Sequence, residues 1–358
     1  MTEITIHGTG IYLDGKPTYA GRTFEGKRIE GLLFNVRAVQ ATFDDENFET
    51  RNRWAYPDTG VWDAQRNVDE FCAALPQWRD HGVLAFTVNF QGGGPLYTPH
   101  IYNHYKNNAF TEHGELKTAY TYRMQQVLEA ADALGMAVIV GFFYWKHTEG
   151  WSDEIVVKAA RNACQFLRDT GRKNFLIEIA NENGPGYQQS LLQGDQVHKI
   201  ILALKPEFPE MLFSTSLAGM DVTRNLPSPA LVAACDYVLL HGNECLPHTL
   251  QLGIEHVRRN PAYRKAPKPI IINEDSPGIP NLDAAWQAEV SWGYYDQGYG
   301  GDDAYGGDKY MDYRSRPRET RYKELSGFQT PPVNWGINSP EKQAFFSRVA
   351  QVTGYVPA

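Results

Sequence analysis

Short apolar runs of strand length recur eight times along this chain, and segments with helical periodicity separate most of them. The runs cover 32–39, 83–90, 136–143, 175–180, 211–215, 237–241, 269–274 and 289–295. The helical segments cover 63–80, 118–134, 152–170, 194–204, 249–259 and 339–352. The eighth run is the least defined, because its first residues also fit a helix that begins at Leu282. Strands that alternate with helices predict a parallel sheet.

Eight such units in one series favour a closed α/β barrel, the (β/α)8 or TIM-barrel fold, over an open doubly wound sheet. No glycine-rich phosphate-binding motif follows the first run, so the open nucleotide-binding fold lacks its usual signal. We expect one catalytic barrel domain over residues 1–358. Residues 1–30 would form a strand or hairpin leader, since Asp14-Gly15 is a strong hairpin turn. Long loops should cover the C-terminal face of the barrel.

Composition excludes several classes of protein. The chain has 34 basic and 42 acidic residues, a net charge of −8, which disfavours binding to nucleic acid or to an anionic membrane. No apolar run is long enough to span a membrane. The four cysteines form no C-x-x-C pair and fit buried thiols. The first residues do not resemble a signal peptide, so we expect a cytoplasmic protein, or a secreted or periplasmic one whose signal is not in this sequence.

The chemistry of an α/β barrel lies at the C-terminal ends of its strands, so polar residues at these ends are the candidates. They are Asn89, Tyr144, Trp145, Asn181, Glu182, His241, Asn243, Glu274 and Trp292. Alternation along the fourth and seventh strands puts Glu182 and Glu274 on the inward face, at the barrel mouth. The same parity places Glu178 deeper inside, where we interpret it as a buried, hydrogen-bonded carboxylate.

Two carboxyl groups on opposite sides of a cleft are the catalytic groups that most glycosidases use to cleave a glycosidic bond. One is protonated and donates to the leaving oxygen, while the other is ionised and attacks the sugar or activates water. Different environments can hold two acids in these two states at one pH. A separation of about 5–5.5 Å would indicate retention of configuration, and about 6.5–9.5 Å inversion.

These strand ends resemble those of glycoside hydrolase clan A, the retaining β-glycosidase barrels. The segment Ile177-Glu178-Ile179-Ala180-Asn181-Glu182 resembles the clan's fourth-strand motif, and 270–274 resembles its seventh-strand motif. His241 resembles the sixth-strand histidine and Trp292 the eighth-strand tryptophan. Several families of the clan carry a tyrosine two residues after that histidine, where this chain has Asn243.

The resemblance implies a role for each residue. Glu182 would be the acid/base, Glu274 the nucleophile, and Asn181 a hydrogen-bonding partner of the sugar 2-hydroxyl. His241 would orient the nucleophile or a sugar hydroxyl, and Trp292 would stack against a sugar ring. We also expect Asn89, Tyr144, Trp145 and Asn243 to bind substrate. The substrate would be an oligosaccharide or polysaccharide cleaved by double displacement, with no cofactor or metal. Long loops after strands two and eight favour exo action or short substrates.

Other hypotheses remain open. The barrel could bind carbohydrate without cleaving it. An aldolase would use a strand-end lysine such as Lys146, and a metal-dependent hydrolase would need several histidines and aspartates at strand ends, which are few. His100 and His104, four residues apart in the long loop after the second strand, are a separate candidate metal pair. The acidic, glycine-rich segment 300–308 does not fit an EF-hand calcium loop. The basic segment 313–321 could meet an acidic sugar. The oligomeric state is left undetermined.

Overall fold

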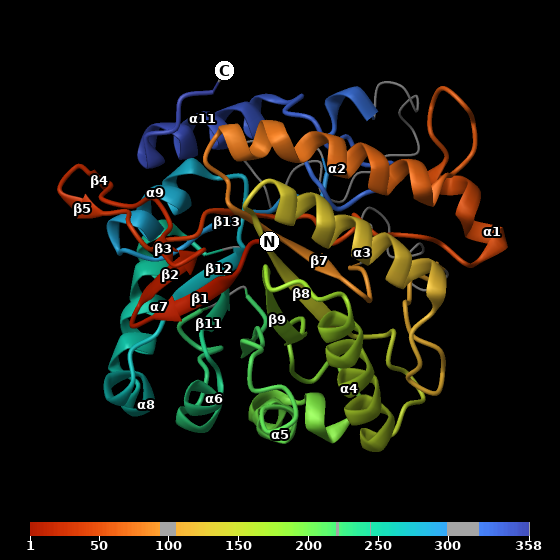
Figure 1. Ribbon diagram of the computed structural model, residues 1–358, viewed down its shortest axis with the longest axis horizontal. Helices are drawn as coiled ribbons and strands as arrows, with labels where there is room; N and C mark the ends of the chain where they lie inside the picture. The colour runs from red at the N-terminus through yellow and green to blue at the C-terminus, as the bar shows by residue number, and fades with distance from the viewer. Residues whose placement is uncertain (94–104, 220–221, 244, 299–321, 358) are drawn as a thin grey trace.

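The computed structural model describes residues 1–93, 105–219, 222–243, 245–298 and 322–357 of the chain (Figure 1). Eight parallel strands form a barrel, and helices surround it. The strands are β6 (Asn35–Arg37), β7 (Ala85–Asn89), β8 (Ala137–Phe143), β9 (Phe175–Ala180), β10 (Phe213–Ser214), β11 (Val238–His241), β12 (Ile270–Glu274) and β13 (Gly293–Tyr294). The predicted α/β barrel is confirmed.

Backbone pairing closes the barrel in two arcs. Six strands follow the order β10-β9-β8-β7-β6-β13, and β11 pairs with β12. A bridge between Ile271 and Ser291 joins β12 to the segment that leads into β13. On the other side, the Asp236 amide donates to the Phe213 carbonyl oxygen over 2.8 Å, next to β10. The strand ends therefore meet in one ring, as the sequence analysis requires.

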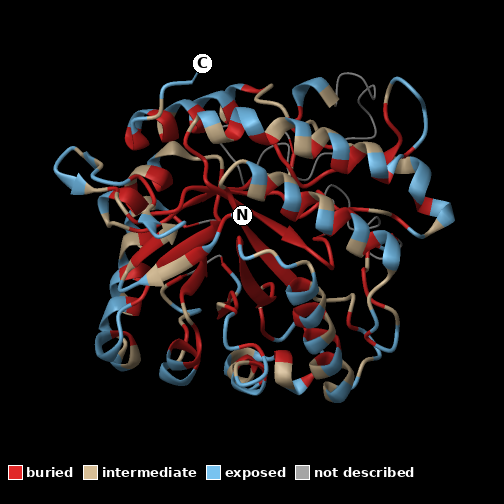
Figure 2. Ribbon diagram, viewed as in Figure 1, coloured by how far each residue is buried: buried red, intermediate tan, exposed pale blue. Residues whose placement is uncertain are grey.

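The helices lie outside the strands, and their exposed faces point away from the barrel (Figures 1 and 2). They are α1 (Phe48–Arg51), α2 (Ala64–Asp80), α3 (Thr118–Ala133), α4 (Asp153–Asp169), α5 (Val197–Leu204), α6 (Pro229–Ala234), α7 (Pro247–Arg259), α8 (Pro261–Lys265), α9 (Ile279–Gln287) and α11 (Pro340–Thr353). The strands are almost entirely buried, as near-continuous apolar runs in a parallel sheet should be. No helix in the described ranges is long and apolar enough to cross a membrane.

Capping residues define the helix starts that the sequence predicted. The Ser152 side chain accepts a hydrogen bond from the Ile155 amide at the start of α4, and Ser339 accepts one from the Lys342 amide at the start of α11. Helix α2 continues through Pro76 to Asp80. The short α6 was not predicted, because six residues give too little periodicity. Helix α9 ends before β13, so the eighth strand is shorter than predicted.

The N-terminal residues form a small antiparallel sheet of β1 (Ile4–His7), β2 (Gly10–Leu13) and β3 (Lys16–Pro17), followed by the hairpin of β4 (Thr23–Phe24) and β5 (Lys27–Arg28). Asp14 and Gly15 both have positive φ, as the predicted two-residue turn requires. Glu3 bridges to Lys173, just before β9 begins. This sheet therefore lies at the N-terminal ends of the barrel strands, opposite the candidate site.

Candidate functional site at the barrel mouth

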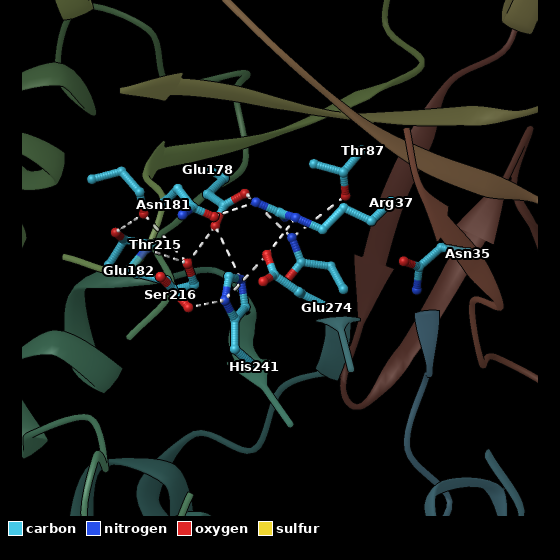
Figure 3. Close-up of polar contacts among 12 residues, drawn as sticks. Asn35, Arg37, Thr87, Glu178, Asn181, Glu182, Thr215, Ser216, His241 and Glu274 are labelled. Carbon is cyan, nitrogen blue, oxygen red and sulfur yellow. Dashed lines mark hydrogen bonds and ion pairs between the residues drawn. The ribbon is translucent and has the colours of Figure 1, made fainter. Parts of the chain in front are cut away.

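Glu182 sits just beyond the end of β9 in an unusual backbone conformation. Its φ is +50°, in the left-handed region that non-glycine residues seldom occupy. Its amide donates to Ser216 Oγ over 2.9 Å, and the next amide, of Asn183, donates to the Ser216 carbonyl oxygen over 2.9 Å. Two hydrogen bonds to residues just past β10 hold this turn, and the Glu182 carboxylate points toward His241 (Figure 3).

Glu274 ends β12 at an irregularity in the pairing with β11. Leu240 pairs with Ile272, but His241 pairs with Glu274, so Asn273 is the extra residue. As a result both Asn273 and Glu274 turn side chains toward barrel residues: Asn273 Nδ2 lies 3.2 Å from Glu178 Oε2, and Glu274 meets Arg37 and His241. Simple alternation placed Glu274 on the inward face, and its contacts with Arg37 and His241 agree with that; alternation alone does not account for the contact of its neighbour Asn273 with Glu178.

His241 lies between the carboxylates of β9 and β12 (Figure 3). Its Nδ1 is 3.2 Å from Glu182 Oε1 and 3.5 Å from Glu274 Oε2, and its Nε2 is 3.7 Å from Glu178 Oε1. One side-chain atom from each of Glu182, His241 and Glu274 lies within 4.8 Å of the other two. The two predicted carboxylates therefore do converge, with a histidine touching both.

Arg37, at the end of β6, completes this cluster and was missed by sequence reasoning. The side chain is buried, its Nε pairs with Glu274, and its Nη2 donates to Asn181 Oδ1. Its Nη1 lies 3.8 Å from Glu178 Oε2. The available signal was a charged residue inside the apolar run 32–39, since a buried arginine needs partner carboxylates.

Electrostatics in the cluster follow from burial and these contacts. Burial disfavours the charged form of His241, but the charge of Glu274 and the contacts with Glu178 and Glu182 outweigh it and raise the pKa to about 9. Burial also acts to raise the pKa of Glu182, yet the hydrogen bond and charge of His241 bring that pKa below its ordinary value. At neutral pH, the proton that Glu182 and His241 can share therefore lies on the imidazole, and the Glu182 carboxylate is ionised.

Asn243, just past β11, contacts the candidate nucleophile directly. Its Nδ2 donates to Glu274 Oε1 over 2.6 Å, while its Oδ1 is buried and has no hydrogen-bond partner in the described structure. Asn181 Nδ2 and both amide atoms of Asn89 are likewise buried and unpartnered among the described residues. Buried polar atoms are nearly always satisfied, so the unpartnered atoms of these three strand-end amides are notable.

Tyr144 and Trp145 follow β8 and lie on the rim of the site. Their ring centroids are 6.0 Å apart with an interplanar angle of 25°. Both side chains are half-buried, and Lys146 Nζ lies 4.7 Å from the Trp145 ring centroid. Electrostatic interaction with Tyr144 acts to raise the pKa of Arg37. These positions are compatible with the predicted contact to substrate.

Trp292 does not have the predicted stacking surface. It is fully buried, its ring centroid lies 5.9 Å from that of Phe345, and its Nε1 donates to Asp275 Oδ2 over 2.5 Å. The side chain fills the wall of the barrel behind the site, and a sugar ring has no exposed face to meet. Tyr295, two residues past the start of β13, interacts electrostatically with Arg37 and acts to raise its pKa.

The other sequence candidates lie elsewhere. His100, His104, the acidic segment 300–308 and the basic segment 313–321 fall outside the described residues. Glu182, His241 and Glu274 could in principle hold a cation. However, Arg37 already pairs with Glu274, and His241 is protonated at neutral pH, so two positive charges border the space that a metal ion would need.

Comparisons with known proteins support the fold. The sequence matches no protein-family model and no curated protein. Among solved structures, the β-1,4-D-mannanase from Cryptopygus antarcticus has a TM-score of 0.52 and 13% identity, covering 93% of this chain and 98% of that one.

Two further neighbours are larger proteins. An exo-β-1,4-mannosidase from Opitutaceae bacterium strain TAV5 has a TM-score of 0.53 and 15% identity, over 97% of this chain and 62% of that one. A β-glucuronidase from an uncultured Clostridium sp. has a TM-score of 0.52 and 12% identity, over 98% and 54%. At these identities the likeness concerns the fold, which this chain shares with glycosidase barrels of differing specificity.

Proposed function

We propose that this protein is a retaining β-glycosidase that cleaves an oligosaccharide or polysaccharide by double displacement. The observation that carries the proposal is the approach of the Glu182 and Glu274 carboxylates, which bring oxygens within 4.8 Å of each other. Retaining enzymes have carboxyl groups about 5–5.5 Å apart, whereas inverting enzymes leave room for a water molecule at about 6.5–9.5 Å. The shared fold with glycosidase barrels agrees with this proposal.

In the first step, Glu274 attacks the anomeric carbon, while Glu182 donates a proton to the departing glycosidic oxygen. Glu274 is suited to attack because Arg37 and Asn243 hold its carboxylate in place. A sugar in the site would exclude water from the partly exposed Glu182, which raises the pKa of Glu182 and draws the shared proton from His241 to its carboxylate. The bond between Glu274 and the sugar forms as the leaving group departs.

In the second step, Glu182 takes a proton from water, and the resulting hydroxide equivalent displaces Glu274 from the anomeric carbon. Asn181 Nδ2, unpartnered in the described structure, donates to a sugar hydroxyl during both steps. Two inversions at one carbon give net retention. The neutral amides of Asn89 and Asn243 supply further hydrogen bonds to a neutral sugar.

The test uses aryl β-mannosides, β-glucosides and β-glucuronides, followed by oligosaccharides of the sugar that is accepted. Glu182→Gln and Glu274→Gln should each lower kcat by about 10³-fold or more while the melting temperature stays near that of the wild type. Glu207→Gln, which alters an exposed glutamate paired with Arg161, is the matched control and should keep full activity. NMR of the first-formed sugar should show retained configuration; inversion, or full activity in either variant, would contradict the proposal.

A further inference from the structure

Glu178 lies beneath the two candidate catalytic carboxylates and is completely buried. Each of its oxygens has two polar neighbours. Ser216 Oγ donates to Oε1, and His241 Nε2 lies 3.7 Å from the same atom. Asn273 Nδ2 donates to Oε2 over 3.2 Å, and Arg37 Nη1 lies 3.8 Å from it. Figure 3 shows Glu178 with Ser216, His241 and Arg37 around it.

Each of these neighbours also holds a part of the catalytic pair. Ser216 Oγ accepts the hydrogen bond from the strained Glu182 amide. Arg37 pairs with Glu274, and His241 lies within 3.5 Å of both carboxylates. Asn273 is the extra residue of the irregular pairing and directly precedes Glu274 in β12. One buried carboxylate therefore contacts four of the residues that surround the two acids.

We propose that Glu178 is a third essential carboxylate, a positioning residue that sets both the placement of Glu182 and Glu274 and the charge of His241 between them. This inference rests on the proposed glycosidase function. It goes beyond that function because Glu178 touches no substrate and acts only through its four neighbours.

The charge balance explains why this position needs an anion. Two cationic groups, Arg37 and His241, are buried in the cluster, and such charges are costly unless paired. Glu182 and Glu274 balance them in the free enzyme, but a proton moves onto Glu182 and a sugar onto Glu274 during catalysis. His241 becomes neutral when its proton moves onto Glu182, so Glu178 is then the negative charge that remains in contact with Arg37.

The remaining ionisable groups around this cluster do not supply that charge. Burial and the charge of Glu178 raise the pKa of Tyr187 and Tyr237, so both phenols stay neutral, and each donates its proton to the backbone. Burial raises the pKa of Asp275 to about 7, so this carboxyl is partly neutral at pH 7. Replacing Glu178 with a neutral residue should therefore make the His241 imidazolium less stable.

Glu178→Gln, made in the full chain, tests the proposal by two readouts. We expect kcat to fall about 100-fold at pH 7 with KM changed less than about threefold. In NMR titrations, with the His241 signals assigned by comparison with His241→Asn, His241 should titrate about one pH unit lower than in the wild type. The basic limb of the kcat/KM profile, which reports the free enzyme, should move by the same amount.

Asp45→Asn is the matched control. Asp45 is also fully buried and hydrogen-bonded, to Thr50 and Trp54, but it lies in the loop region after β6 and contacts none of the cluster. It should lower the melting temperature without moving the basic limb. Wild-type kcat in Glu178→Gln, or a lower kcat with His241 titrating as in the wild type, would overturn the proposal.

Ser216→Ala covers the case in which Glu178→Gln does not fold. This variant removes only the hydroxyl between Glu178 and the Glu182 amide, and we expect about tenfold lower kcat with a KM within about threefold. Unchanged kcat would overturn the proposed link. If the wild type cleaves no glycoside, the glycosidase proposal fails by itself, and the NMR titration of His241 still decides whether Glu178 sets its charge.

Discussion

At the level of single residues, Trp292 supports the wall of the site, and its buried ring offers no face for contact with substrate. The indole is enclosed by the barrel wall and donates to the buried carboxylate of Asp275, which also accepts from Asn281 Nδ2. Trp292→Phe keeps an aromatic ring but leaves this carboxylate short of a donor. We expect the free energy of unfolding to fall by about 1–3 kcal/mol with KM for oligosaccharides unchanged.

Urea denaturation and steady-state kinetics check this prediction. Trp286→Phe is a suitable control, because this buried indole donates to Asp283 on α9, away from the site. Both variants should lose stability without losing affinity. A large rise in KM for Trp292→Phe alone would instead show that the ring meets the sugar.

Asn243 makes a second prediction at this scale, because its amide stands 2.6 Å from Glu274 Oε1. Asn243→Asp is almost isosteric, yet it places a second carboxylate against the nucleophile. Two adjacent carboxyl groups cannot both ionise easily, so the pair retains a proton to higher pH. The acidic limb of the kcat/KM profile should move upward, and activity at pH 6 should fall by at least about tenfold.

Asn243→Ala is the companion variant for this test. It removes the same donor without adding charge, so its kcat should fall while its acidic limb stays in place. If both variants gave the same pH profile, the charge argument for Asn243→Asp would be wrong.

At the level of elements, pattern and parity predicted the strands and the convergence of Glu182 and Glu274, because burial in a parallel barrel enforces apolar runs. They failed where the backbone departs from regular geometry. The inserted Asn273 and the left-handed Glu182 depend on hydrogen bonds to other strands, which no local pattern encodes. Arg37 was missed for a related reason, because its role depends on contacts with Glu178 and Glu274, which are far away in the sequence.

The contact between β7 and β8 yields a prediction at the same scale. A Cβ on Gly141 would lie 2.1 Å from Asn89 Oδ1, so Asn89 reaches its position only because its neighbour is glycine. Gly141→Ala should displace the Asn89 amide, lower stability by about 1–3 kcal/mol and reduce kcat/KM about tenfold.

A double-mutant cycle distinguishes this clash from a general loss of packing. In the Asn89→Ala background, Gly141→Ala should cost much less stability, because the amide that it strikes is gone. Activity should stay low in the double variant, since the amide is missing there too. Equal stability losses in both backgrounds would argue against the steric explanation.

For the molecule as a whole, the buried cluster predicts how activity depends on pH. The proton shared by Glu182 and His241 is needed for departure of the leaving group, and the pKa of His241 is raised to about 9. We therefore expect kcat/KM to decline as pH rises through about 9. Kinetics with an aryl glycoside of low leaving-group pKa provide the control, because such a substrate needs little protonation and its kcat should fall much less.

The same protonation predicts a pH-dependent part of the folding stability. His241 has a pKa of about 9 in the folded protein against an ordinary value of 6.5, so the folded state holds its proton more tightly than the unfolded chain. Its contribution is complete below pH 6.5 and is lost as pH rises toward 9, because the folded state binds more protons in this window. The free energy of unfolding of the wild type should therefore fall between these values more steeply than that of His241→Asn. Parallel curves for the two proteins, measured by urea denaturation, would show that the imidazolium is not stabilised by the carboxylates around it.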